Sequence, residues 1–208
     1  MKNSLTFCAA VFMSASILAA QPRAVDVNGF DLGNVKLGMD LEQARAAMAA
    51  HFGVLPSAIA LDYKAEPSPL TGTKLPMRLR YESGGEELSV NLEPRLPITA
   101  STRRFAVAQI VRRWPEGVRS QAQIFEAAQA QYGPPSGIVD QRMLWCARPL
   151  ANPAVVCLQD NPAVFAVSAK GMALFDVSWV DARVEAEMAA KARKAQESQK
   201  TLKPQKPH

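Results

Sequence analysis

Two segments of the chain carry the same set of helix signals, and no other feature constrains the fold as much. In the first segment, Asp40 is a good N-cap and Gln43 stands at the third helical position, where it completes a capping box. Gly53 is placed to stop the helix, because glycine readily takes the left-handed conformation that follows a last turn. The apolar residues recur at the spacing of one helical face and are Leu41, Ala44, Met48 and Phe52.

The second segment repeats these signals. Ser120 is the cap, Gln123 completes the capping box, and Gly133 followed by proline ends the helix. Both segments run thirteen residues from cap to glycine, and an aromatic residue precedes each glycine. The expected apolar face consists of Ile124, Phe125, Ala128 and Tyr132. We interpret the pair as a duplication with a period of about 80 residues, although ordinary helix signals also produce such pairs by chance.

Strand signals follow each helix. Residues 75–81 and 87–92 flank Ser83-Gly84-Gly85, which predicts a hairpin, and residues 105–111 predict a third strand. The second set of expected strands comprises residues 142–146, 155–158, 164–168 and 173–179, with turns at Asp160-Asn161-Pro162 and Lys170-Gly171. Helix, strands, helix, strands is the order of an α+β fold in which an antiparallel sheet carries helices on one face.

These signals also divide the chain into parts. We expect a first α+β unit at residues 21–100 and a second at residues 101–181, in tandem, each a helix packed on an antiparallel sheet. Residues 54–74 are rich in Pro, Ser, Thr and Gly and predict a long loop between helix and sheet. Residues 94–102 predict a second loop and the junction between the units.

Residues 1–20 have the pattern of a secretory signal peptide. Lys2 gives a positive start, residues 5–18 are predominantly apolar, and Ala19-Ala20 offers a small-residue cleavage site. The run is shorter than the roughly 20 apolar residues that span a bilayer, which favours cleavage over an uncleaved anchor. Cys8 lies too early in the run for a lipobox. We therefore expect a periplasmic or secreted protein with no later membrane-spanning segment.

Removal of the leader leaves Cys146 and Cys157 of the three cysteines. An even pair in an exported chain predicts one structural disulfide, worth roughly 3 kcal/mol in the chain-entropy model. A redox or metal pair is the alternative. Such sites use C-x-x-C spacing, whereas these cysteines are eleven positions apart with no internal histidine nearby.

The C-terminal tail, residues 182–208, differs in charge from the rest. It contains seven Lys or Arg and three Glu, and so carries the whole +4 net charge of the mature chain. Residues 181–200 are rich in alanine and other helix formers, whereas Pro204 and Pro207 forbid a regular helix beyond them. We expect a solvated helix that ends in disorder. The alternative is a contact with an anionic surface such as lipid head groups or cell-wall polymer, but an amphipathic membrane helix is disfavoured because its apolar face would be mostly alanine.

Three stretches resemble a known family. Gly38-Met39-Asp40-Leu41-Glu42-Gln43-Ala44 resembles the helix opening of the SmpA/OmlA-type outer-membrane assembly lipoproteins, and Tyr132-Gly133-Pro134-Pro135-Ser136 with Leu144-Trp145 resembles their G-x-P and aromatic strand. The related β-lactamase inhibitor protein is similar to two such units in tandem. The matching residues cover about 30 of 208 positions, and the family's lipobox is missing. The resemblance implies a fold, an envelope compartment and a binding or scaffolding role.

The chain offers little material for catalysis. Of its two histidines only His51 is internal, and we interpret it as structural because it falls at the end of a helix, where a cation meets the C-terminal dipole. The sequence contains no phosphate-binding glycine motif and no Cys/His metal spacing. We therefore expect a protein that is not an enzyme, with no catalytic residue, metal site or cofactor. Glu86-Glu87 is interpreted as a solvated pair.

The candidate binding patch brackets the third strand and consists of Arg103, Arg104, Arg112, Arg113 and Trp114. Adjacent residues of a strand point to opposite faces, so one arginine of each pair should lie on the face opposite Phe105, Val107 and Val111. Such a patch suits an acidic protein or polymer, to which the tryptophan would add a cation–π surface. The alternative is that charged residues merely end the strand. Nucleic acid is a poor partner for an exported chain whose core is electrically neutral.

The sequence thus predicts a non-catalytic envelope protein that binds a macromolecule, either another envelope protein or an anionic polymer. The contact surface would be the sheet face opposite the helices. One alternative is an inhibitor of a secreted hydrolase, which the tandem resemblance implies. Another is a small hydrolase that uses two converging carboxylates, a possibility that no sequence pattern removes.

Overall fold

The computed structural model describes residues 24–98, 105–115, 117, 119–147, 157 and 163–202. The expected leader, the end of the tail and most of the expected strand at residues 155–158 with the turn after it lie outside the described residues. Within the part described, no helix combines the length and the apolarity needed to cross a membrane.

Two helices form where their caps predict them. Helix α1 (Leu41–Phe52) begins at the Asp40–Gln43 capping box, and Gly53 ends it in the left-handed conformation with φ 66° and ψ 34°. Helix α2 (Gln121–Tyr132) begins at the Ser120–Gln123 capping box and ends at Gly133. Both predictions are confirmed, because each helix is specified by local contacts that the sequence alone contains.

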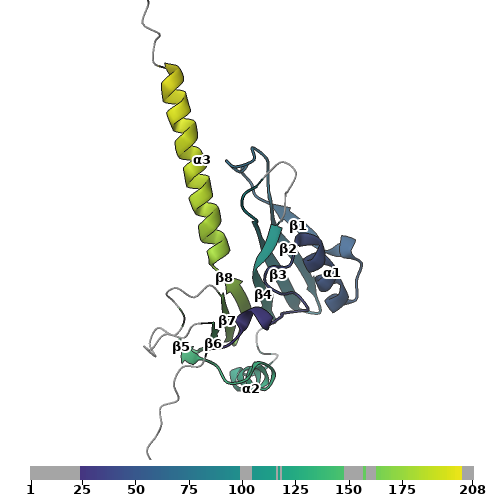
Figure 1. The fold of residues 1–208 in the computed structure, drawn as a ribbon. Helices are drawn as coiled ribbons and strands as arrows, with labels where there is room; N and C mark the ends of the chain where they lie inside the picture. Colours follow the sequence, from purple (N-terminus) through teal and green to yellow (C-terminus); the bar gives the residue numbers. More distant parts are fainter. Residues whose placement is uncertain are drawn as a thin grey trace, which may run out of the picture.

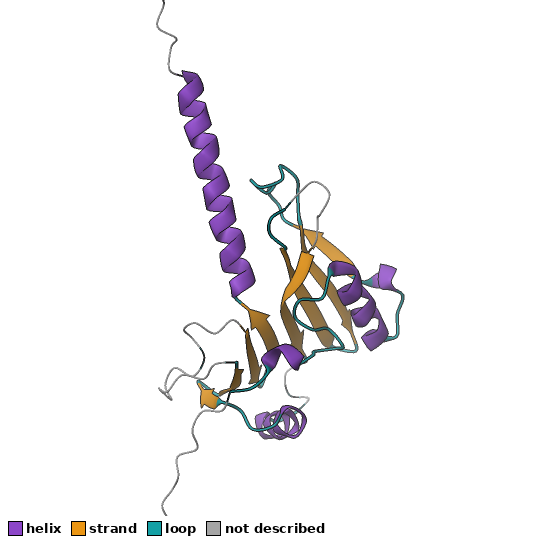
Figure 2. Ribbon diagram, in the orientation of Figure 1, coloured by secondary structure: helices purple, strands orange, loops and turns teal. Residues whose placement is uncertain are grey.

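The strands form one antiparallel sheet (Figures 1 and 2). In chain order they are β1 (Ala60–Tyr63), β2 (Pro76–Ser83), β3 (Glu86–Pro94), β4 (Phe105–Arg113), β5 (Gly137–Val139), β6 (Arg142–Cys146), β7 (Ala163–Ser168) and β8 (Gly171–Asp176). Across the sheet the order is β1-β2-β3-β4-β8-β7-β6-β5. The α+β class and the antiparallel sheet are therefore confirmed.

Three element predictions need correction. The expected loop at residues 54–74 contains β1 and the 3-10 turn η2 (Pro56–Ala58). The expected strand at residues 173–179 ends at Asp176, because a long helix, α3 (Ser178–Leu202), begins directly after it. Strand β5 was not expected at all. Both missed strands are short edge strands whose pairing with a neighbour decides their conformation.

Strand β4 lies at the centre of the sheet. It pairs with β3 on one side and with β8 on the other, and each of the helices α1 and α2 is followed by four strands. The residues expected to join two units, 94–102, begin at the last residue of β3 and precede β4, the strand that pairs with it. The sheet therefore continues without a break across the expected boundary between residues 100 and 101.

Helices α1 and α2 cover the same face of the sheet. A short N-terminal segment with the 3-10 turn η1 (Val27–Gly29) adds Val27, Leu32 and Val35 to this side. The main core takes its strand residues from both halves of the sheet, among them Leu79, Leu88, Val90, Ile110, Trp145, Phe165 and Leu174. Burial of these side chains at about 25 cal/mol per Å² is the main stabilising contribution.

A β-bulge in the β3–β4 pair changes which side chains share a face. The register steps from Asn91 opposite Gln109 to Leu92 opposite Val107, so Ala108 is an extra residue. Phe105 and Val107 therefore point to the helix side, whereas Val111 points away from it together with Arg113. The expectation that Val111 shares a face with Phe105 and Val107 is wrong, because strict alternation holds only in a regular strand.

Helix α3 leaves the end of β8 and continues well beyond the sheet (Figure 1). Only a stripe on its first half is partly buried, and every described side chain from Lys191 to Gln199 is exposed. The expectation of a solvated helical extension is thus confirmed for this part of the tail.

Candidate functional site

The sheet face opposite α1 and α2, here called the open face, changes in character along the sheet. Over β1 to β3 it is polar. A chain of hydrogen bonds continues from β2 through β3 to β4, because Arg78 Nε donates to Asn91 Oδ1 over 2.8 Å and Asn91 Nδ2 donates to Gln109 Oε1. Over β8 and β7 the same face carries small and apolar side chains, such as Ala173 and Ala166.

A disulfide covers one end of the apolar part. Cys146 of β6 and Cys157 lie within disulfide distance, with their Cα atoms 5.6 Å apart, as the sequence predicts. Both are buried and form a second small core with Val164. This core is packed by Val139, Leu144 and Phe175, which all lie on the open face.

A shallow hollow of about 190 Å³ lies beside this core. Its floor is apolar and consists of Val111, Ala166 and Ala173. Three cations from different elements stand at its edge: Arg113 of β4, Arg142 of β6, and Lys170 of the β7–β8 turn. We call this place the basic hollow. Positive charge around an apolar floor is suited to a partner that presents a carboxylate next to an apolar group.

The expected arginine patch is divided by the sheet. Arg113 lies on the open face at the basic hollow, with a side chain that is 61% exposed and a salt bridge of 3.2 Å to Glu87. Arg112 points to the helix side. Trp114 Nε1 donates to the backbone oxygen of Ala169 over 3.1 Å. The remaining two, Arg103 and Arg104, lie outside the described residues. Sequence reasoning missed Arg142 and Lys170, which only strand pairing brings beside Arg113.

Glu86 is the centre of a charged network on the helix side. Arg112 Nη2 donates to Glu86 Oε2 over 3.0 Å, and Arg112 Nε lies 2.9 Å from Glu86 Oε1. His51 Nε2 at the end of α1 is 2.8 Å from the same Oε1. Burial alone raises the pKa of Glu86, but the hydrogen bonds and charges of Arg112 and His51 outweigh it and lower this pKa below its ordinary value. The interpretation of Glu86-Glu87 as a solvated pair is wrong, because each carboxylate binds an arginine.

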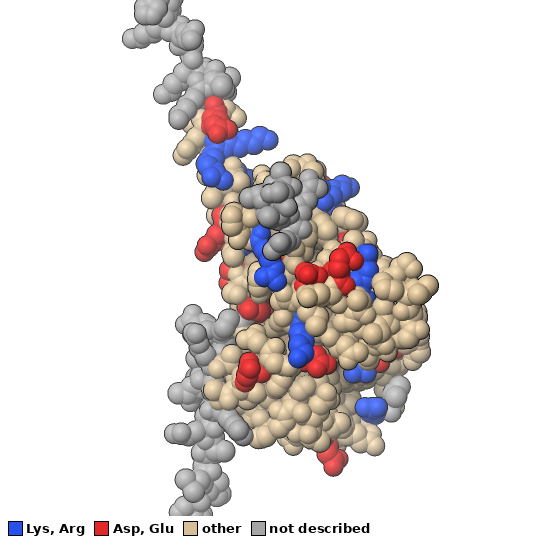
Figure 3. Space-filling view, turned by 45° about the vertical axis from the view of Figure 1, so that its right-hand side comes forward, with Lys and Arg blue, Asp and Glu red and all other residues tan. Residues whose placement is uncertain are grey.

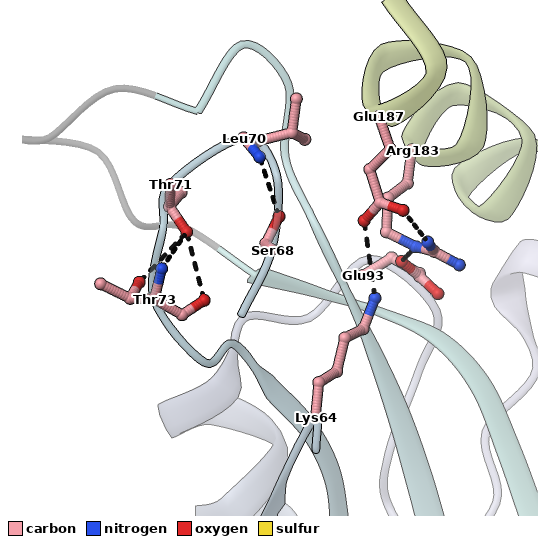
Figure 4. Close-up of polar contacts among 8 residues, drawn as sticks. All are labelled: Lys64, Ser68, Leu70, Thr71, Thr73, Glu93, Arg183 and Glu187. Atoms are coloured by element: carbon pink, nitrogen blue, oxygen red, sulfur yellow. Dashed lines mark hydrogen bonds and ion pairs between the residues drawn. The ribbon is translucent and has the colours of Figure 1, made fainter. Parts of the chain in front are cut away.

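A second charged network fastens α3 to the sheet (Figure 4). Arg183 Nε donates to the buried Glu93 on the open face of β3, and Arg183 Nη1 donates to Glu187 over 3.0 Å. Lys64 Nζ lies 4.0 Å from Glu187. Burial alone lowers the pKa of Arg183, but the two carboxylates outweigh it and raise this pKa further. The carboxylates of Glu93 and Glu187 converge here, as a hydrolase that uses two carboxylates would require. Each of them, however, is bound by the Arg183 guanidinium.

A larger open depression of about 900 Å³ lies at the start of α1. Its lining includes Asp40, Tyr63 and Arg95. Asp40 already accepts the cap hydrogen bond of α1, whereas Arg95 Nη2 donates to the Gly38 oxygen over 2.6 Å. The Arg95 guanidinium also stands 5.5 Å from the ring centroid of Trp179. Because these two charged groups hold the fold together, we place the candidate site at the basic hollow instead.

Among the described residues, no group of three or more His, Cys, Asp or Glu is arranged to hold a metal ion. Both signs of charge are interspersed on the side of the molecule that Figure 3 presents.

Comparison with known proteins adds no assignment. No protein-family model, no curated protein and no solved structure matches this chain.

Proposed function

We propose that the chain is an exported, non-catalytic envelope protein that binds an acidic partner protein on its open face. The observation that carries this proposal is the basic hollow, in which Arg113, Arg142 and Lys170 surround an apolar floor. Carboxylates of a partner would pair with the arginines, whose planar guanidinium groups match carboxylate geometry. An apolar side chain of the partner would cover the floor.

The local nature of the charge favours a protein over a long anionic polymer. A polymer needs a track of cations, whereas on the neighbouring strands of the open face Arg78 and Arg80 alternate with Asp62 and Glu82. Mixed charge of this kind orients a partner that carries the complementary pattern.

Two features support export. Residues 1–20 have the pattern of a leader, and the one cysteine pair left after its removal lies at disulfide distance. Disulfides persist in oxidising compartments and are rare in the cytosol.

We further infer that the fold is built of two like units. The support is that α1 precedes β1 to β4, that α2 precedes β5 to β8, and that the two sets of four strands join at the β4–β8 pair. In this reading the open face is one surface to which both units contribute, and the basic hollow lies where they meet.

The test is capture from an envelope extract with paired charge-reversal variants. We expect one acidic protein to be retained by the parent chain and lost with Arg113→Glu/Arg142→Glu. It should be retained by Lys74→Glu/Arg119→Glu, which makes the same change of charge at exposed positions away from the hollow and outside the charge pattern of the open face. The retained protein should bind the purified chain directly, and more weakly as salt is raised.

Equal loss from both variants would mean that only the overall charge matters, and would overturn the proposal. Retention of protein-free anionic polymer in place of a protein would assign the open face to the polymer. Near-UV circular dichroism of each variant shows whether the fold has survived the substitutions.

A further inference from the structure

A row of charged side chains crosses the open face and ends at the basic hollow. Cross-strand pairing places Glu82 of β2 opposite Glu87 of β3, and Glu87 opposite Arg113 of β4. Directly opposed residues of an antiparallel pair share a face, and neighbouring strands lie about 4.8 Å apart. The row therefore changes from acidic to basic within about 10 Å. We call these three residues the charged row.

Gly171 of β8 leaves a gap next to the charged row. It pairs with Arg113 on the side away from Glu87. A Cβ atom at this position would collide with the backbone oxygen of Arg112, so the position admits no side chain. The gap adjoins the apolar floor of the hollow, and a ligand carboxylate above it would approach the Arg113 guanidinium from the side opposite Glu87.

Arg113 already binds a carboxylate of the chain itself. Its Nη1 lies 3.2 Å from Glu87 Oε2, and the two side chains are 61% and 27% exposed. A salt bridge that is exposed to this degree is weak. A ligand carboxylate at the hollow can therefore displace Glu87, which makes Glu87 an internal competitor for the same guanidinium.

Displacement of Glu87 has a cost that depends on the ligand. Without Arg113, Glu87 faces Glu82 directly, and like charges opposite each other on neighbouring strands repel. A ligand that brings only a carboxylate creates this repulsion. A ligand that also brings a cation to Glu87 replaces the salt bridge that it has broken.

We propose that the basic hollow selects partner segments that carry a cation beside their carboxylate and apolar group, and that Glu87 sets this selectivity. The inference rests on the proposed function of the open face and describes the partner's surface more closely. The partner's carboxylate would lie above Gly171, its apolar group on the floor, and a Lys or Arg side chain above Glu87, about 10 Å from the carboxylate. A purely anionic polymer lacks the cation and is discriminated against by the two glutamates.

Two short peptides test the selectivity on the full exported chain. They are acetyl-Lys-Gly-Leu and acetyl-Gln-Gly-Leu, each with a free C-terminal carboxylate, so that they differ in the ammonium group. Binding is followed by the amide chemical shifts of the floor residues Val111 and Ala173. We expect the parent chain to bind the lysine peptide about two- to fivefold more tightly than the glutamine peptide. Both peptides should lose affinity for Arg113→Glu/Arg142→Glu.

Glu87→Gln separates the internal competitor from general electrostatics. The substitution should tighten binding of the glutamine peptide about two- to fivefold, because Arg113 is no longer occupied. It should also abolish the preference for the lysine peptide, because the acceptor of the ammonium group is gone. The matched control is Glu126→Gln, the same change at an exposed position of α2, and it should alter neither affinity. Near-UV circular dichroism shows whether each variant keeps the fold.

Equal affinity of the two peptides for the parent chain would overturn the proposal, and so would a preference for lysine that persists in Glu87→Gln. Failure of both peptides to shift the floor amides at millimolar concentration would overturn it as well. The proposed function fails separately, through the absence of a captured protein that depends on Arg113 and Arg142. A captured protein that depends on these arginines but binds Glu87→Gln more tightly than the parent would keep the proposed function and contradict the selectivity.

Discussion

The side chain of Tyr132, at the end of α2, connects the N-terminal segment to strand β7. Its ring centroid lies 4.5 Å from that of Phe165 and 4.9 Å from that of Phe30. Its hydroxyl donates to the backbone oxygen of Asp31 over 3.2 Å. Burial, with a smaller contribution from the charge of Asp31, raises the pKa of Tyr132 to about 12.

The raised pKa predicts a loss of stability at alkaline pH. The group stays protonated in the folded chain, so its contribution is complete below pH 10 and is lost as the pH rises towards about 12. We expect one of the three tyrosines to ionise late when the absorbance of phenolate is followed against pH. This late component should be missing in Tyr132→Phe. Its persistence there would assign the raised pKa to another tyrosine.

Glu86 illustrates what residue-level reasoning from sequence misses. Its two cationic partners, His51 and Arg112, are 35 and 26 positions away along the chain. The sequence identifies each as a charged residue near the end of an element, but only the packing of α1 against β3 and β4 brings the three together. For the same reason, the sequence alone placed Arg112 in the candidate binding patch, whereas the structure shows its guanidinium bound to Glu86 on the helix side.

At the scale of an element, the attachment of α3 rests on Arg183 and Glu93. Their side chains are 17% and 11% exposed, so the ion pair is largely removed from water. Arg183→Met keeps most of the side-chain volume but leaves Glu93 without its cation. We expect the free energy of unfolding in urea to fall by about 3 kcal/mol, the lower part of the range for a broken buried pair. Amides in the first turns of α3 should also exchange faster.

The matched control for this prediction is Arg193→Met, the same substitution on the exposed second half of α3. It should change the unfolding free energy by less than about 0.5 kcal/mol. Equal effects of the two substitutions would show that the Glu93 contact contributes little to stability.

Elements were predictable from sequence where their signals are local. The capping boxes at Asp40 and Ser120, and the glycine turn between β2 and β3, specify their own structures through contacts a few residues apart. The edge strand β1 and the bulge at Ala108 have no such local signal, since both depend on a neighbouring strand. The basic hollow was predicted only through Arg113 for the same reason: strand pairing brings its other two cations into place.

At the scale of the whole molecule, the central position of β4 has a consequence for folding. Ile110 is fully buried between Val90 of β3 and Leu174 of β8, which belong to the two halves of the sheet. The main core likewise runs without interruption from Leu79 to Trp145. Neither half can lose β4 without exposing apolar surface of the other, so we expect the sheet to unfold as one cooperative unit.

Ile110→Ala tests this expectation. The substitution should lower stability by about 2 to 5 kcal/mol, because it removes buried methyl groups and leaves a cavity. If the sheet is one cooperative unit, the slowest-exchanging amides of the β2–β3 pair and of the β6–β7 pair should lose protection by the same amount. A loss confined to one pair would mean that the halves unfold separately, although they share a strand boundary and a core. Cooperative unfolding would also explain how the basic hollow at the β4–β8 boundary keeps its shape, since any opening of that boundary costs the stability of the entire sheet.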